Sequence, residues 1–152
     1  MPLVSAFSRR LPVPLMHRQI LYLSHLAPPG GLGGFRLADI AQQAATRNQL
    51  IGIRAVLLFD GYRFCHLFEG TDEETVGLLA RLRADPRHQG LRVLSDRLLC
   101  ECEITPAYVL GPLVSGHCDA LEFDVFEGDC PPTGAAALTH FTQILRRADL
   151  QP

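Results

Sequence analysis

Apolar residues follow two different spacings along the chain, and these spacings predict the order of strands and helices. Two apolar runs within residues 51–68 flank Asp60 and Gly61, and an Asp-Gly pair between two such runs is typical of a β-hairpin. The shorter run 19–24 alternates between two faces, which predicts another strand. A further apolar run over 91–100 predicts a fourth strand.

Three other stretches have helical spacing. Apolar side chains within 36–47 recur at i, i+3, i+4, i+7 and i+8, which predicts an amphipathic helix. Thr71 and Glu74 have the spacing of a capping box and open a second helix. Pro86 ends that helix because proline disfavours helical geometry in the residue before it. A third amphipathic helix is expected over about residues 134–148.

This order predicts an α+β fold of the ferredoxin-like βαββαβ type, with two helices on one face of the sheet and an added C-terminal helix. In such a sheet the first and third strands are neighbours, which places Tyr22 beside His66. We expect residues 1–18 to form an N-terminal arm, 19–110 the main domain and 111–152 a C-terminal extension.

The composition narrows the possible functions. A chain of 152 residues is about one domain, and its net charge of -2 gives no reason to expect nucleic acid. No apolar run approaches the roughly 18 residues of a membrane span. The arginines and prolines near the start are unlike a secretory signal, so we expect a cytoplasmic protein. No Ser-His-Asp or Cys-His pairing follows from the spacing, and we expect no enzymatic activity.

The cysteines suggest a different kind of site. There are five of them, too many to pair completely within one chain, and free thiols are the expectation in a reducing compartment. Cys100 and Cys102 would face the same way on a strand, within reach of a loop that carries His117 and Cys118. Thiolates with imidazole suit copper(I) or zinc. A CxC motif is weaker than paired CxxC motifs, so a metal or redox sensor is an alternative and not the main hypothesis.

Several short motifs keep their order and spacing over about residues 19–110. They are Leu21-Tyr22-Leu23-Ser24, Arg47-Asn48 before Gly52, Phe64, Leu67-Phe68-Glu69-Gly70, and Arg81 with Asp85-Pro86-Arg87-His88. Together these motifs resemble the BLUF family, the blue-light sensors that use flavin. The resemblance covers the predicted main domain.

The resemblance implies an FAD whose ring lies between the two helices. On matching positions, Tyr22 would be the photochemical electron and proton donor, His66 would occupy the relay position beside it, and Asn48 would hold the amide edge of the ring. Tyr22 and His66 would also contact the flavin. The other residues that the resemblance implies for cofactor binding are Ser24, Phe64, Arg81, Asp85, Arg87 and His88.

The chain also departs from the family pattern. His66 stands where the family has a glutamine. A neutral imidazole offers one donor and one acceptor, as an amide does, but it has a different reach and takes a proton near about pH 6.5. We therefore expect the light-induced red shift to be altered or lost. Acidic residues at 101 and 103, with Ala107 and Val109, replace basic, aromatic and methionine positions, and carboxylates there would oppose an anionic cofactor.

The leading hypothesis is a flavin-binding sensor that signals to a protein partner or across a homodimer. One alternative is a flavin-free interaction or dimerisation module of the same fold, and the other is the Cys/His sensor. Each site residue also has a structural interpretation. Tyr22 suits a strand-helix interface, Asn48 suits the C-cap of the first helix, and His66 suits a satisfied position in the core.

Overall fold

The structure, a computed structural model, describes residues 16–27, 37–101, 103 and 113–151. Its elements are β1 (His17–Leu26), α1 (Leu37–Ile51), β2 (Arg54–Phe59), β3 (Arg63–Thr71), α2 (Asp72–Ala84), β4 (His88–Leu99), β5 (Leu113–His117), α3 (Ala120–Phe123), the short 3-10 helix η1 (Asp124–Phe126), α4 (Gly134–Arg147) and β6 (Asp149–Gln151). Most of the predicted N-terminal arm, residues 1–15, lies outside the described residues.

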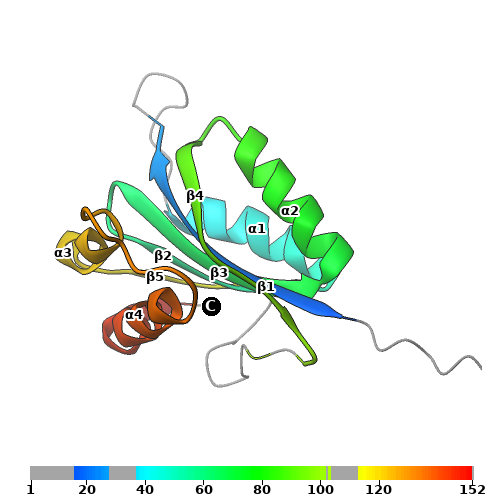
Figure 1. The fold of residues 1–152 in the computed structure, drawn as a ribbon. Helices are drawn as coiled ribbons and strands as arrows, with labels where there is room; N and C mark the ends of the chain where they lie inside the picture. Colours follow the sequence, from blue (N-terminus) through cyan, green and yellow to red (C-terminus); the bar gives the residue numbers. More distant parts are fainter. Residues whose placement is uncertain (1–15, 28–36, 102, 104–112, 152) are drawn as a thin grey trace, which may run out of the picture.

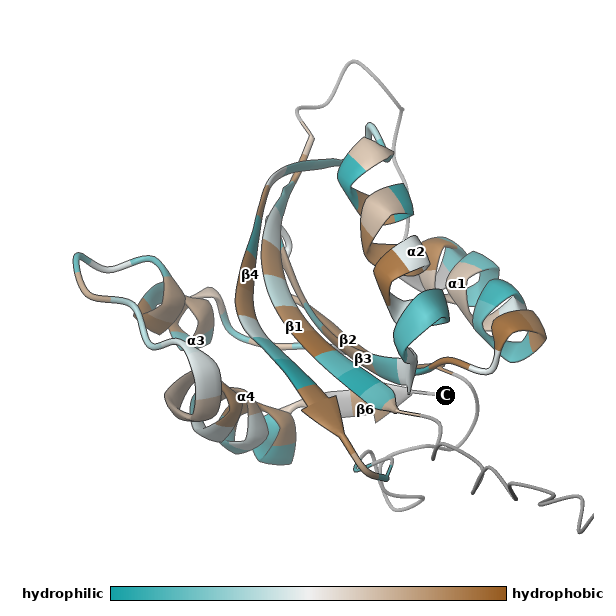
Figure 2. Cartoon of the chain, turned by 45° about the vertical axis from the view of Figure 1, so that its right-hand side comes forward, coloured by the Kyte–Doolittle hydropathy of each residue, from teal (hydrophilic) through white to brown (hydrophobic). Residues whose placement is uncertain are grey.

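The strands form one sheet in the order β4-β1-β3-β2-β5-β6. β1 and β3 are antiparallel neighbours, as predicted, and their register places Tyr22 opposite His66. β5 runs parallel to β2, so the sheet is mixed. α1 and α2 cover one face of the sheet, and α4 covers the other (Figures 1 and 2). The α+β prediction, with two helices on one face and a C-terminal helix, is confirmed.

Two local signals act as the sequence indicates. In the hairpin turn, the Asp60 Oδ1 accepts hydrogen bonds from the backbone N–H groups of Tyr62 at 2.9 Å and Arg63 at 2.6 Å, and Gly61 takes a positive φ of 101°. At the start of α2, the Thr71 hydroxyl accepts from the Glu74 backbone N–H at 3.3 Å. Both features satisfy backbone donors that would otherwise lack partners.

The end of α1 differs from the prediction. The helix continues to Ile51 and ends before Gly52, which has a φ of 70°. The interpretation of Asn48 as a C-cap is therefore wrong, because this residue lies inside the last turn. Glycine adopts positive φ without a steric penalty, and it is the usual residue after a helix C-terminus.

Alternation along the central strands produces two separate hydrophobic cores. Tyr22 belongs to the core under α1 and α2, whereas Leu21 and Leu23 belong to the core under α4. Phe123 and Phe141 fill this second core. The C-terminal helix therefore covers this face of the sheet together with α3 and η1. No helix in the described ranges is long and apolar enough to cross a membrane.

The second core gives a stability prediction for α4. Phe141 is buried on this helix, so Phe141→Ala should lower the free energy of unfolding by about 3 to 5 kcal/mol, through lost burial and the cavity left behind. Urea denaturation measures this change. Gln143→Ala on the exposed side of the same helix is the control and should change stability by less than about 0.5 kcal/mol. Equal effects of the two substitutions would show that α4 does not pack as described.

Candidate functional site

Tyr22 and His66 form a hydrogen-bonded pair in the core between the sheet and the helices α1 and α2. The Tyr22 hydroxyl lies 3.0 Å from the His66 Nδ1, and the two rings meet edge to face with centroids 5.2 Å apart. Both side chains are almost completely buried. Their contact follows from the register of β1 and β3, which places the two residues directly opposite each other.

Burial keeps both members of this pair uncharged at neutral pH. It lowers the pKa of His66 to about 3, with a further contribution from the nearby His88 and Arg47. It also raises the pKa of Tyr22 well above its ordinary value. The second ring nitrogen of His66, Nε2, is buried and has no hydrogen-bond partner within the described ranges. A buried polar atom without a partner is costly, and in native proteins it often marks a place for a ligand or water.

A second pair lies next to the first. The Ser24 Oγ is 2.8 Å from the His88 Nδ1. The His88 ring packs edge to face against Tyr22, with centroids 6.2 Å apart, and in a tilted arrangement against Phe64, with centroids 4.8 Å apart. Burial is the main cause that lowers the pKa of His88 to about 4. The structure thus brings together three of the predicted cofactor residues, Ser24, Phe64 and His88, around Tyr22.

Asp85 and Arg87 organise the turn after α2. The Arg87 Nε donates to both carboxylate oxygens of Asp85 at 3.0 Å, and its Nη2 donates to Oδ2 at 2.6 Å. Burial by itself would raise the pKa of the Asp85 carboxyl. The hydrogen bonds from Arg87 lower it by more than burial raises it, so the pKa of Asp85 is below its usual value. The Arg87 Nη1 also donates to the Gln43 Oε1 at 3.2 Å, which joins this turn to α1.

The guanidinium groups of Arg47, Arg81 and Arg87 lie near this turn. Burial is the largest cause that lowers the pKa of Arg47, and the positive charges of Arg81 and Arg87 lower it as well. The Arg47 Nε is buried and has no hydrogen-bond partner within the described residues. Such a cluster favours an anionic ligand. Sequence reasoning named Arg81 and Arg87 but missed Arg47 as a site residue, although it directly precedes Asn48 in a motif that the sequence analysis used.

Asn48 lies in the same layer of the protein. It is on α1 and is fully buried, which is unusual for an amide side chain. Its backbone carbonyl accepts from the Ile53 N–H at 3.0 Å, across the turn that leaves the helix.

A buried glutamine lies on the other face of the sheet. Gln19 is on β1, three residues before Tyr22, so its side chain points away from the Tyr22 face. Its Nε2 donates to the Glu69 Oε2 at 3.0 Å, and its Oε1 accepts from Arg97. The structure therefore does not show that the chain lacks a functional glutamine. It does show that His66, and not Gln19, is the hydrogen-bond partner of Tyr22.

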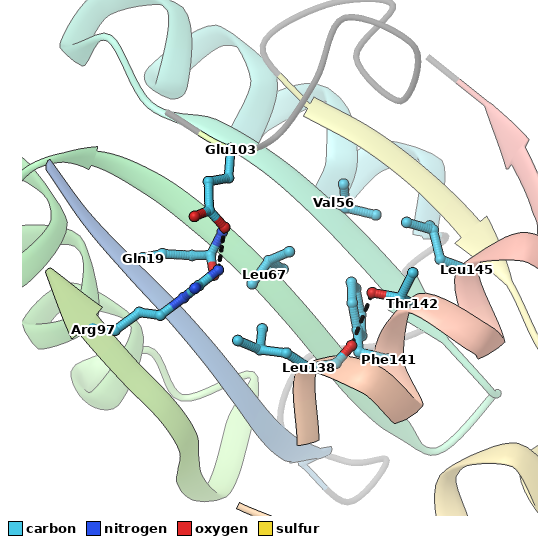
Figure 3. Close-up of a pocket in the computed structure, with 9 residues that line it drawn as sticks. All are labelled: Gln19, Val56, Leu67, Arg97, Glu103, Leu138, Phe141, Thr142 and Leu145. Carbon is cyan, nitrogen blue, oxygen red and sulfur yellow. Dashed lines mark hydrogen bonds and ion pairs between the residues drawn. The ribbon is translucent and has the colours of Figure 1, made fainter. Parts of the chain in front are cut away.

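The acidic residue Glu103 does not lie where the sequence analysis expected a carboxylate that would oppose an anionic cofactor. Glu103 forms an ion pair with Arg97 and lines a cavity under α4 with Gln19 (Figure 3). Its carboxylate is thus on the face opposite Tyr22 and does not face the arginine cluster. Ala107 and Val109 lie outside the described residues.

The structure separates the thiol and imidazole groups proposed for a metal site. Cys100 follows the edge strand β4. His117 and Cys118 lie at the end of β5, beside Phe59, on the far side of three intervening strands. Cys102 lies outside the described residues. Within the described part of the chain, no group of three or more His, Cys, Asp or Glu side chains is placed to hold a metal ion.

Comparison with known protein families gives the context for this site. The family model described as "BLUF: Sensors of blue-light using FAD" matches residues 17–103, which is more than half of the chain. The chain belongs to the BLUF family. This match contains both members of the Tyr22–His66 pair and the arginine cluster.

Several proteins and structures are similar to this BLUF protein. Photoactivated adenylate cyclase subunit alpha of Euglena gracilis is 39% identical over 79 residues, which are 52% of this chain and 8% of the relative. The beta subunit of Euglena longa is 37% identical over 79 residues, which are 52% of this chain and 9% of the relative. This chain thus spans less than a tenth of the length of these relatives.

Solved structures share the fold at low sequence identity. The ground state of BlsA has a TM-score of 0.63 at 18% identity, and the match covers 90% of this chain and 91% of BlsA. The BLUF domain of BlrP1 has a TM-score of 0.56 at 21% identity, covering 86% of this chain and 77% of that domain. A structure of BlrP1 from Klebsiella pneumoniae is described with FMN and cyclic diGMP.

The residues of this BLUF protein fit a flavin in two respects. The buried Nε2 of His66, without a partner in the described residues, offers a hydrogen bond to a polar ring edge. The cluster of Arg47, Arg81 and Arg87 offers positive charge to phosphate groups. The individual assignments of Ser24, Asn48, Phe64 and the other residues to flavin contacts remain predictions.

The burial of His66 predicts a specific dependence of stability on pH. The folded-state pKa is about 3, whereas the unfolded chain has an ordinary histidine pKa of about 6.5. The unfolded state therefore binds the extra proton first, and stability from this residue is complete above about pH 6.5 and is lost as the pH falls toward 3. Between pH 7.5 and 5, the wild-type protein should lose about 2 kcal/mol more than His66→Gln.

Urea denaturation of both proteins at several pH values measures this difference. His117→Gln, a change at an exposed imidazole, is the control and should follow the wild-type pH dependence. Parallel curves for wild type and His66→Gln would show that His66 is accessible to protons in the folded state.

Proposed function

We propose that this protein binds FAD and senses blue light, and that His66 changes its photochemical response. The observation that carries the proposal is the buried hydrogen bond between the Tyr22 hydroxyl and the His66 Nδ1, with the opposite ring nitrogen of His66 left without a partner in the described residues. Membership of the BLUF family supports the flavin assignment.

Different residues of the chain would hold different parts of the cofactor. Asn48 and His66 would hydrogen-bond the ring, and Arg47, Arg81 and Arg87 would attract the phosphates. Ser24, Phe64 and His88 would support Tyr22 and close the site, and Asp85 would orient Arg87 through their hydrogen bonds. A bound flavin would supply the absorption of blue light and an acceptor for an electron.

His66 differs from a glutamine in how it can switch. When Tyr22 donates its hydroxyl proton to Nδ1, the single proton of the neutral imidazole lies on Nε2, and that atom becomes a donor. Turning an amide by 180° exchanges its donor and acceptor, whereas turning the imidazole ring places carbon atoms where the nitrogens were. The imidazole can exchange its donor and acceptor only by moving its proton from one ring nitrogen to the other, with Tyr22 then accepting. Rotation of the side chain gives no second arrangement, so light should not produce the usual amide-type rearrangement.

We further propose that the output passes to a protein partner or across a homodimer, and that this chain is not itself an enzyme. The relatives named as photoactivated adenylate cyclases are matched over less than a tenth of their length. We therefore propose light sensing for this chain, and not cyclase activity.

A flavin-free interaction module of the same fold is the second candidate. It is favoured by the packing of the site itself, because the Tyr22 hydroxyl already has a hydrogen-bond partner and the rings of His66, Phe68 and His88 surround it. In this case Tyr22 and His66 would stabilise the core and have no photochemical role.

An absorption measurement separates these proposals. The full chain, reconstituted with FAD, should show the visible flavin band in darkness and no reversible red shift under blue light. His66→Gln should restore a reversible red shift, and Tyr22→Phe in that background should remove it again. A red shift in the wild-type protein would contradict the role assigned to His66, and failure to bind FAD would favour the flavin-free module.

The arginine cluster gives a second test of cofactor binding. Arg81→Gln removes one cation from the cluster and should weaken FAD binding about fivefold, which is the scale of a partly exposed charge interaction. Titration with FAD, followed by flavin fluorescence, measures the affinity. Arg83→Gln on the same helix is the control, and it should leave the affinity unchanged. Equal effects of both substitutions would mean that only the overall charge matters.

A further inference from the structure

A cavity of about 140 Å³ lies between α4 and the sheet, on the face opposite Tyr22 (Figure 3). Most of its wall is apolar: Val56 comes from β2, Leu67 from β3, and Phe141 and Leu145 from α4. Val56, Phe141 and Leu145 are buried, so this end of the cavity lies deep in the protein. An apolar cavity of about 150 Å³ is large enough to hold benzene.

The packing of α4 against the sheet is incomplete at this cavity. β3 is a central strand, and its residues from Arg63 to Gly70 are buried with the exception of Leu67, which is only partly buried. Leu138, which lines the cavity from α4, is also only partly buried. Leucine is among the residues most often fully buried. The partial exposure of two facing leucines therefore marks a place where the helix leaves the space above the sheet unfilled.

The charged groups at the other end of the cavity are paired with each other. Arg97 and Glu103 lie there and form an ion pair, with 39% and 51% of their side chains exposed. Arg97 also donates to the Gln19 Oε1 through Nε at 3.0 Å and Nη2 at 2.9 Å, and the Gln19 Nε2 donates to Glu69 at 3.0 Å. The two charges that line the cavity have opposite signs, so this end favours neither a cation nor an anion.

The rest of the wall offers few partners to a water molecule. Thr142 lines the cavity, but its hydroxyl donates to the Leu138 carbonyl within α4 at 2.9 Å. The side chains of Val56, Leu67 and Phe141 have no polar atoms. A buried water makes about three hydrogen bonds, and a cavity lined by apolar groups stays dry and can hold an apolar molecule. The apolar end therefore suits an uncharged apolar occupant better than water or an ion.

We propose that this cavity binds a small neutral aromatic hydrocarbon of the size of benzene or toluene, with its ring among Val56, Leu67 and Phe141. The ring would fill the unfilled space between α4 and the sheet and restore dispersion contacts there. The Phe141 ring adds an aromatic contact to this burial. The occupied cavity would stabilise the packing of α4 on the sheet. The site is separate from the flavin site, because the two lie on opposite faces of the sheet.

Isothermal titration of the full chain with toluene tests the proposal. Saturable binding at one site is expected. Benzylamine and benzoate, which carry opposite charges on the same ring, should each bind at least about tenfold more weakly than toluene, because the paired groups at the mouth compensate neither charge. The result should be the same with and without bound FAD, and in His66→Gln, so it does not depend on the flavin proposal. Absence of saturable toluene binding, or tighter binding of either ion, would overturn the proposal.

Substitutions at the two partly buried leucines locate the bound hydrocarbon. Leu67→Phe fills the cavity and should weaken toluene binding at least about tenfold, whereas Leu67→Met keeps the volume and should retain it. Unchanged affinity in Leu67→Phe would place the toluene elsewhere and overturn the proposal.

An enlarged cavity gives a test that does not depend on the folding of Leu67→Phe. Leu138→Ala removes a partly exposed side chain from the wall, so this variant is expected to fold. It should raise the affinity for naphthalene relative to toluene at least about fivefold, because the larger cavity admits a second ring. An unchanged ratio of the two affinities would overturn the proposal.

Discussion

The antiparallel pairing of β1 with β3 is the constraint on which the rest of this structure depends. These strands are at the centre of the sheet and are covered on both faces. Their register places Tyr22 opposite His66 on one face and Gln19 opposite Glu69 on the other. A shift of β1 by one residue would turn each of its side chains to the other face of the sheet. Tyr22 would then leave the core under α1 and α2, and Gln19 would leave the face covered by α4. The Tyr22–His66 pair and the cavity under α4 therefore both depend on one strand register.

The dry environment of the Tyr22 face determines the chemistry available to His66. In water its imidazole would titrate near neutral pH, but burial holds the ring neutral. A neutral ring in a packed core offers one donor and one acceptor, in either of two tautomers, and does not take up an extra proton at neutral pH. Tyr22 and His66 thus form a buried, uncharged pair in this BLUF protein.

Family membership and fold similarity support different conclusions here. The family match covers the strands and helices that carry the Tyr22 face, while BlsA shares the fold at only 18% identity. The fold is therefore compatible with much variation in sequence, and the particular response of this chain must be argued from its own residues. The buried Tyr22–His66 pair is one such arrangement of its own residues, and the polar network around Gln19 and Arg97 is another.

The sequence by itself determined the elements whose causes are local. The turn at Asp60 and the cap at Thr71 depend on residues within a few positions, so they could be predicted. Adjacency of Tyr22 and His66 was also predictable, because the order of elements implies the strand neighbours. The tertiary structure alone decided which distant residues meet. In the folded protein Arg47 lies near Arg81 and Arg87, and Glu103 lies on the opposite face of the sheet. Cys100 and Cys118 lie far apart in the sheet. These outcomes depend on the order of the strands and on the face that each side chain occupies, which local sequence does not determine.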